Sequence, residues 1–211
     1  MASSPDPQTL RRFSVTERAL HWAHATGFFA MLASGLILYL PALSTLVARR
    51  NLVKNLHIWA AVAWALAIVL VVLVGNRHAL RASWREAERL DRNDRRWLRG
   101  RRVPQGRFNA GQKLNILVTA AFAVLFAVSG FFLWLGERDH WFLFAGTGTV
   151  HELLTLVSML LVAGHLYLAL IHPTTRHALR GITTGEVRAD WAKRHHRAWF
   201  DEHSRGAAPP K

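Results

Sequence analysis

The stretch Val150–Ile171 reads VHELLTLVSMLLVAGHLYLALI, an apolar run with histidines at positions 151 and 165. On an α-helix each residue turns by ~100°, so the 14 residues from His151 to His165 bring the second ring to within about 40° of the first. The same residues advance ~21 Å along the axis, about two-thirds of a bilayer's hydrocarbon core. One helix face therefore presents two imidazoles at two depths. A polar ring in lipid is costly without a partner, so both histidines are functional candidates.

Three further runs are long and apolar enough to cross a bilayer, in a chain of 211 residues that is 51% hydrophobic. We therefore predict an all-α membrane protein, a bundle of four transmembrane helices, and expect Thr16 to cap the first helix. The predicted spans are residues 20–40, 56–74, 114–135 and 153–171. The predicted regions are an N-terminal segment 1–15, a membrane domain 16–175 that contains a loop at 76–107, and a basic tail 176–211.

The charge distribution predicts the topology. The net charge is +14, with 11 arginines from Arg77 to Arg107 and 8 Lys or Arg residues from Arg176 onward. The connection between spans 1 and 2 holds only Arg49, Arg50 and Lys54, and the connection between spans 3 and 4 holds only Arg138. Basic residues collect in cytoplasmic loops. Both termini and the 76–107 loop are therefore predicted to be cytoplasmic, the loop to contain a surface helix, and no nucleic-acid partner is expected.

The chain contains no cysteine. It therefore forms no disulfide, ligates no iron–sulfur cluster, provides no thiolate ligand for haem, and attaches no haem covalently through cysteine thioethers.

Depth sorts the membrane histidines into two pairs. His57 and His151 stand at the external ends of their helices, whereas His21 and His165 lie towards the cytoplasmic side. Each pair supplies two imidazoles, enough to saturate one haem iron axially, which suits electron transfer rather than oxygen chemistry. His24 competes with His21 because it lies only ~60° away around the helix. A packing histidine with an ordinary hydrogen bond is the alternative for each ring.

The remaining histidines of the tail are expected to be solvated or to contact a partner. These are His177, His195, His196 and His203, and a short helix is predicted around residues 187–200.

The sequence contains a weak internal repeat. Ser34-Gly35 precedes Leu56-His57 by 22 residues, and Ser129-Gly130 precedes Val150-His151 by 21 residues. The repeat indicates either duplication of a helix pair or the recurring need for small residues where helices approach closely.

Five motifs then occur in order over nearly the whole chain. They are Glu17–Trp22 (ERALHW), Leu56-His57, Phe108–Lys113 (FNAGQK), His151 with His165, and Trp191–His196 (WAKRHH). In these motifs the chain resembles the gamma subunit of membrane-bound formate dehydrogenase, a di-haem cytochrome b. The FNAGQK and WAKRHH segments are the specific parts of the likeness.

The resemblance implies two haem b groups, an external one held by His57 with His151 and a cytoplasmic-side one held by His21 with His165. It favours His21 over His24 because of the ERALHW context. It implies an iron–sulfur beta subunit as electron donor, itself fed by a molybdenum or tungsten alpha subunit. The chain would then be a multi-pass, lipid-embedded subunit of the bacterial inner (plasma) membrane.

The resemblance also implies a quinone site, for menaquinone or ubiquinone, formed by Asn109, Gly111 and Gln112. Chemistry agrees, because a quinone carbonyl needs hydrogen-bond donors, and amide side chains and a helix N-terminus supply them. Capping of the helix by Asn109 is the simpler alternative.

Two alternative functions stay open. The histidine pattern also fits the cytochrome of a hydrogenase or of another quinone-linked dehydrogenase. From a different class, the chain would be a haem-free membrane anchor or transporter built on the same helices. In the preferred interpretation the chain is the electron-transfer subunit of an oxidoreductase complex.

Overall fold

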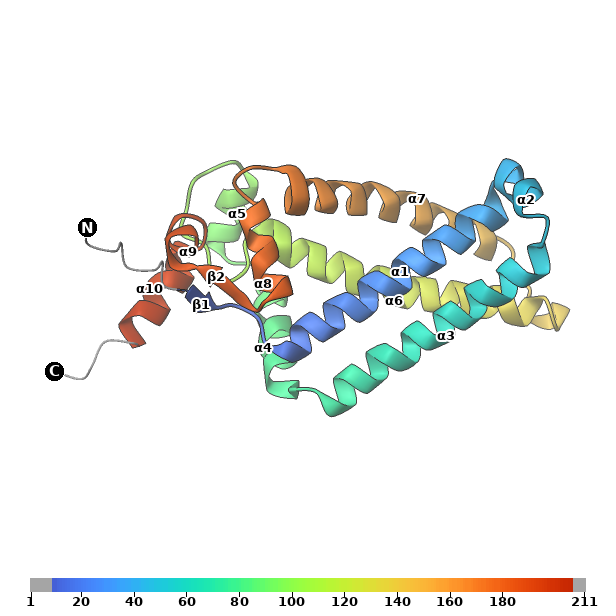
Figure 1. Cartoon of the computed structure of the whole chain (residues 1–211), viewed down its shortest axis with the longest axis horizontal. Coiled ribbons are helices and arrows are strands. Elements are labelled where there is room, and N and C mark those ends of the chain that lie inside the picture. The colour runs from blue at the N-terminus through green and yellow to red at the C-terminus, as the bar shows by residue number, and fades with distance from the viewer. Residues whose placement is uncertain (1–8, 207–211) are drawn as a thin grey trace, which may run out of the picture. The chain divides into compact units, whose positions relative to one another are not determined.

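A computed structural model describes residues 9–206; residues 1–8 and 207–211, which belong to the predicted N-terminal segment and tail, lie outside the described part. Four long helices confirm the all-α class and the predicted number of transmembrane helices (Figure 1). They are α1 (Val15–Tyr39), α3 (Arg50–Val74), α6 (Ala110–Gly136) and α7 (Thr147–Leu166), the last extended to Ile171 by the π-turn η2 (Tyr167–Ile171). At 25 to 27 residues each, counting α7 with η2, they are long enough to cross a bilayer.

Large apolar side chains cover the outside of these helices. Leu66 of α3 is 65% exposed and Leu160 of α7 is 75% exposed, and the other spans carry similar residues. Apolar surface of this extent is costly in water and favourable in hydrocarbon. The outward faces of the spans are therefore lipid-facing surfaces.

Residues 14–80 form one compact unit, made of α1, the short helix α2 (Pro41–Val47) and α3. Ser14, not Thr16 as predicted, caps α1, in a capping box with Glu17. The Thr16 hydroxyl instead accepts a hydrogen bond of 2.9 Å from the amide of Asn76, just past the end of α3. The start of α1 thus meets the end of α3, so the two helices run antiparallel.

The other unit comprises residues 1–13 and 81–211, of which the described parts are 9–13 and 81–206. Its long helices α6 and α7 are joined through a short 3-10 turn, η1 (His140–Phe142). The predicted surface helix of the basic loop is confirmed, and the loop contains two helices, α4 (Arg77–Glu88) and α5 (Arg92–Leu98).

A buried ion pair fastens α5 to the first turn of α6. The Lys113 ammonium lies 2.7 Å from the Asp94 carboxylate and donates to the carbonyl of Arg89 at 3.0 Å. Both charged side chains are less than 10% exposed. Removal of one partner would leave an uncompensated charge, so each residue requires the other.

A small subdomain at the polar end of α6 combines the N-terminal residues with the tail. Strand β1 (Thr9–Arg11) pairs antiparallel with β2 (Glu186–Arg188), with Leu10 opposite Val187 (Figure 1). The tail also contains η3 (Arg176–Ala178), α8 (Leu179–Thr183), α9 (Ala189–His195) and α10 (Arg197–Gly206). The single tail helix predicted for residues 187–200 is therefore two helices that follow a strand. We call this assembly the tail subdomain; its core consists of Val187, Trp191, Ala192 and Trp199.

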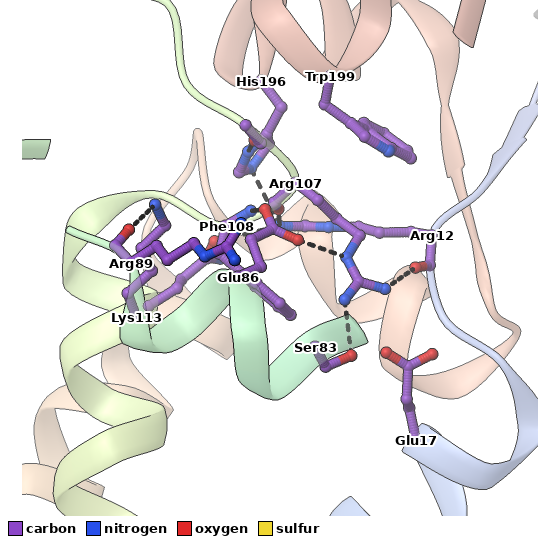
Figure 2. Close-up of polar contacts among 12 residues, drawn as sticks. Arg12, Glu17, Ser83, Glu86, Arg89, Arg107, Phe108, Lys113, His196 and Trp199 are labelled. Atoms are coloured by element: carbon purple, nitrogen blue, oxygen red, sulfur yellow. Dashed lines mark hydrogen bonds and ion pairs between the residues drawn. The ribbon is translucent and has the colours of Figure 1, made fainter. Parts of the chain in front are cut away.

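His196 is buried in the tail subdomain, which corrects the expectation that it is solvated or contacts a partner. It is only 1% exposed, and its Nδ1 lies 2.7 Å from the carbonyl of Gly106, while its Nε2 lies 3.1 Å from Nη2 of Arg12 (Figure 2). A guanidinium can only donate, so Nε2 must accept and Nδ1 must carry the hydrogen. Through these two hydrogen bonds the neutral ring, which belongs to the tail, connects the N-terminal residues with the loop before α6.

Burial and charge keep this ring neutral. Desolvation, and after it the charge of Arg12, lowers the pKa of His196 from 6.5 to about 3, although the hydrogen bond to the Gly106 carbonyl acts in the opposite direction. Burial and the neighbouring Arg107 lower the pKa of Arg12 to about 9, so Arg12 stays cationic at neutral pH. The cation therefore faces a neutral acceptor rather than a second charge.

Acidification is expected to open the tail subdomain. Folded His196 has a pKa of about 3 against an ordinary value of 6.5, so between these values the unfolded tail binds more protons. The contribution of neutral His196 to the free energy of unfolding is fully present above pH ~6.5. It falls by about 1.4 kcal/mol per pH unit as the pH drops towards ~3. Hydrogen exchange of the β1–β2 and α9 amides, corrected for intrinsic rates, measures the opening.

The control is His196→Gln, whose amide can donate to Gly106 and accept from Arg12 without titrating. It should keep protection at neutral pH and lose the acid dependence. An unchanged acid dependence in this variant would show that another group opens the subdomain.

Candidate functional site

His57 is held inside the unit of residues 14–80 by the helix opposite. Its Nδ1 lies 2.9 Å from the hydroxyl of Ser34, near the end of α1, while His57 itself lies in the second turn of α3. The Cε1 atom of the ring faces Gly35, where an added Cβ would stand at 3.4 Å. Small residues on α1 thus form the surface against which the ring packs.

His151 is held in the same way inside the other unit. Its Nδ1 lies 2.8 Å from the hydroxyl of Ser129, near the end of α6, and a Cβ added at Gly130 would stand 3.5 Å from its Cε1. The ring of Phe126 contacts it edge-on, with centroids 5.2 Å apart. The weak sequence repeat of the two Ser-Gly pairs therefore corresponds to the same serine–histidine contact in each of the two units.

His24 makes a different contact. Its Nδ1 accepts a hydrogen bond of 3.3 Å from the indole nitrogen of Trp64 on α3. Indole only donates, so in the neutral ring the hydrogen of His24 stands on Nε2. An imidazole needs a nitrogen lone pair to bind iron, and in His24 the available lone pair is already engaged. This contact favours His21 as the ligand on α1.

His21 and His165 lie at the other ends of their helices. Between His21 and Ser34, the partner of His57, α1 advances 13 residues, which is about 20 Å. His165 lies at the end of α7, directly before the π-turn η2, and its side chain is exposed. Each unit thus carries histidines at both ends of its helix pair. π-Turns within helices occur frequently at functional sites.

Each predicted iron pair takes one histidine from each unit. His21 and His57 belong to residues 14–80, and His151 and His165 to the other unit. The pairing of His57 with His151 and of His21 with His165 stays a prediction from depth.

The donor set fits a haem held by two imidazoles. The candidate rings stand on apolar helices, and in His57 and His151 the Nδ1 atom has a protein partner. Histidines that bind metals almost always use their second ring nitrogen in this way, because the second bond fixes the ring's orientation. The absence of cysteine restricts axial haem ligation by this chain to nitrogen, oxygen or thioether groups.

The predicted quinone residues lie at the start of α6, and the simpler alternative, capping of the helix by Asn109, is confirmed. Asn109 caps the helix, its Oδ1 accepting from the Gln112 amide at 2.9 Å, and Gln112 Oε1 accepts in return from the Asn109 amide at 3.1 Å. Gly111 stands in the first turn, where a Cβ would lie 3.2 Å from the Trp97 ring of α5. All three predicted residues are partly accessible.

Arg12 is a residue of this region that the sequence analysis missed. Its Nη2 donates to Gln112 Oε1 at 3.1 Å and to the carbonyl of Arg107 at 2.7 Å. Glu86 of α4 accepts from the Phe108 amide at 3.0 Å and pairs with Arg107 at 3.2 Å. The FNAGQK and WAKRHH motifs, far apart in sequence, are therefore parts of one cluster.

The chain is similar to cytochrome subunits of bacterial formate dehydrogenases. It is 23% identical over 207 residues to "Formate dehydrogenase, cytochrome b556 subunit" of Haemophilus influenzae, covering 90% of this chain and 82% of that protein. It is 25% identical over 214 residues to the cytochrome b556(fdo) subunit of Escherichia coli K12, covering 92% and 93%. It is 22% identical over 207 residues to the nitrate-inducible cytochrome b556(Fdn) subunit of the same strain, covering 90% of each.

One family matches most of the length. Residues 12–185 match the family described as prokaryotic cytochrome b561. This range contains the four spans, the four candidate haem ligands and the start of α6. A cytochrome b of this kind carries haem b, which agrees with the imidazole donor set. The chain belongs to the prokaryotic cytochrome b561 family.

Proposed function

We propose that this protein is the membrane cytochrome b subunit of a formate dehydrogenase complex, which carries electrons across the bacterial inner membrane to menaquinone or ubiquinone. The donor would be an iron–sulfur beta subunit, fed by a molybdenum or tungsten alpha subunit. The similarity to three formate dehydrogenase cytochrome subunits supports the assignment, because it covers at least 90% of this chain.

One observation carries the electron-transfer role: each helix pair has a histidine towards each of its ends. The two histidines of α7 are ~21 Å apart along the helix, and those of the other pair lie at opposite helix ends. Two haem irons held at these two depths would shorten the distance of each electron transfer across the membrane. When bound, haem b supplies one-electron chemistry between ferric and ferrous iron.

The ligands divide between the two sides. His57 and His151 would hold the external haem, and His21 and His165 the cytoplasmic-side haem. Because two imidazoles would hold each iron, the protein would exclude oxygen and substrate from it.

The start of α6 would supply the donors for a quinone. The capping box occupies the amide oxygens of Asn109 and Gln112, whereas no bond from either side-chain NH₂ group is found among the described residues. The amide of Gly111, in the first helical turn, has no partner within the helix. These N–H groups are suited to hold a quinone carbonyl and stabilise the charge it gains on reduction.

The topology follows from charge. The loop that contains α4 and α5 and both chain ends would lie in the cytoplasm, because these segments hold most of the Lys and Arg residues. A quinone site at the start of α6 would then draw its protons from the cytoplasm.

Formate is expected to reduce the cytochrome in its native complex. A tagged chain purified gently from its own membranes should bring iron–sulfur and molybdenum or tungsten subunits with it, and formate should generate the reduced b-type α-band. Reduction by hydrogen but not by formate would indicate a hydrogenase cytochrome instead. A purified protein with no b-type band would indicate the haem-free anchor or transporter.

Haem content tests the ligands. His57→Ala and His151→Ala should each lower the content from about two haems to about one, because an axial ligand is lost. Loss of His151 and His165 together should remove both, since α7 serves each haem. His24→Ala is the matched control and should keep both haems, because its Nδ1 already binds Trp64. Wild-type protein with about one haem per chain would contradict the two-haem assignment.

The quinone site is tested by a substitution that preserves the cap. Asn109→Asp keeps the oxygen that accepts from Gln112 but removes the NH₂ donor, and Asp is an equally good N-cap. Formate-to-quinone turnover should fall by about tenfold, the cost of one lost hydrogen bond of about 1.4 kcal/mol, while haem content and folding stay unchanged. Unchanged turnover at limiting quinone would place the quinone elsewhere.

A further inference from the structure

We propose that Ser34 and Ser129 are positioning residues that fix the tautomer of His57 and His151, and that they lower the reduction potential of the haem these histidines hold. The proposal rests on the assignment of both histidines as ligands of the external haem. It assigns a role to the Ser-Gly pairs, which the proposed function leaves unexplained.

The first step is to locate the hydroxyl hydrogens. Ser34 Oγ lies 2.8 Å from the carbonyl oxygen of Ala30, one turn earlier on α1, and Ser129 Oγ lies 2.7 Å from that of Leu125 on α6. A carbonyl oxygen has no hydrogen to give, so each serine must donate to it. Serines inside helices commonly bond back to the preceding turn in this way. The single hydroxyl hydrogen of each serine is thereby used.

The histidine must then provide the hydrogen of the second contact. The Ser34–His57 and Ser129–His151 separations of 2.9 Å and 2.8 Å are hydrogen-bond lengths. With the serine hydrogen committed to the backbone, Nδ1 of each ring donates to the hydroxyl oxygen. A neutral ring has one N–H, so the lone pair stands on Nε2, the form that binds iron.

His24 shows that the fold does not impose this tautomer on every ring. Its Nδ1 accepts from the Trp64 indole and therefore has the opposite protonation. The two candidate ligands of the external haem thus share a serine contact at Nδ1, whereas His24, which competes with His21 for the other haem, accepts a hydrogen bond at Nδ1.

The hydrogen bond from Nδ1 to the serine hydroxyl also determines whether the reduction potential of the haem rises or falls. An Nδ1–H that donates to an acceptor makes the imidazole a stronger electron donor towards a metal on Nε2. A stronger donor stabilises ferric more than ferrous iron, so the reduction potential falls. Two such ligands on one iron act in the same direction.

The test is a redox titration of the b-type α-bands in the purified complex. Ser34→Ala and Ser129→Ala should each raise the potential of the external haem and leave the other haem unchanged. A tenfold loss in the preference for ferric iron would correspond to ~59 mV for a one-electron couple. Ser34→Thr and Ser129→Thr keep the hydroxyl and should restore the potential.

Thr155→Val is the matched control for a purely structural role. The Thr155 hydroxyl bonds back to the His151 carbonyl at 2.9 Å, one turn along α7, so its removal perturbs the helix without touching the ring bond. It should leave the potential unchanged. Shifts of equal size in the Thr155 variant, or in the Ala and Thr variants of Ser34 and Ser129, would overturn the proposal.

The haem content of each variant is measured as well, because a variant that loses the external haem has no potential to compare. Loss of the external haem in the Ala variants with retention in the Thr variants supports the proposal, and loss in both, or an unshifted potential in both Ala variants, refutes it. His57→Ala is measured alongside. If that variant keeps both haems, the proposed ligand assignment fails, which is a separate result from a serine effect that is absent.

Discussion

The structure depends on how a polar ring is satisfied between apolar helices. An imidazole placed in hydrocarbon without a hydrogen bond costs several kcal/mol. In each helix pair a serine near the end of the first helix meets a histidine near the start of the second. Such a contact forms only when the two helices are antiparallel and in one register. The bond that relieves the cost of the ring therefore also fixes the depth at which the ring stands.

At the polar end of α6 the constraint is charge rather than hydrocarbon. Lys113 is buried but paired with Asp94, and Arg12 is buried but bonded to three acceptors, which belong to Arg107, Gln112 and His196. A neutral His196 is essential, because a protonated ring would face the Arg12 cation in a desolvated place. The N-terminal residues and the tail thus brace the helix start whose N–H groups are the proposed quinone donors.

The four long helices, the positions of the histidines along them and the Asn109 cap could be predicted because they are local or periodic features. The cap of α1 was misassigned to Thr16 because Ser14 and Thr16 are both good caps, and a contact with Asn76, 60 residues away, decided between them. The burial of His196 was missed for the same reason, since its partner Arg12 lies 184 residues away. Three-residue strands show no periodicity, so the β1–β2 pairing is equally invisible in sequence.

The repeat holds at one end of the helix pairs and breaks at the other. Both pairs place a histidine near the start of the second helix against Ser-Gly near the end of the first, so each pair could orient one of the proposed haem ligands. At the opposite end His21 stands on the first helix of its pair and His165 on the second of the other. Equivalent ligands suit a site that only relays electrons. In the proposed function the two histidines that depart from the repeat hold the haem that passes electrons to quinone, and the N–H groups at the start of α6 would supply the hydrogen bonds that quinone reduction requires.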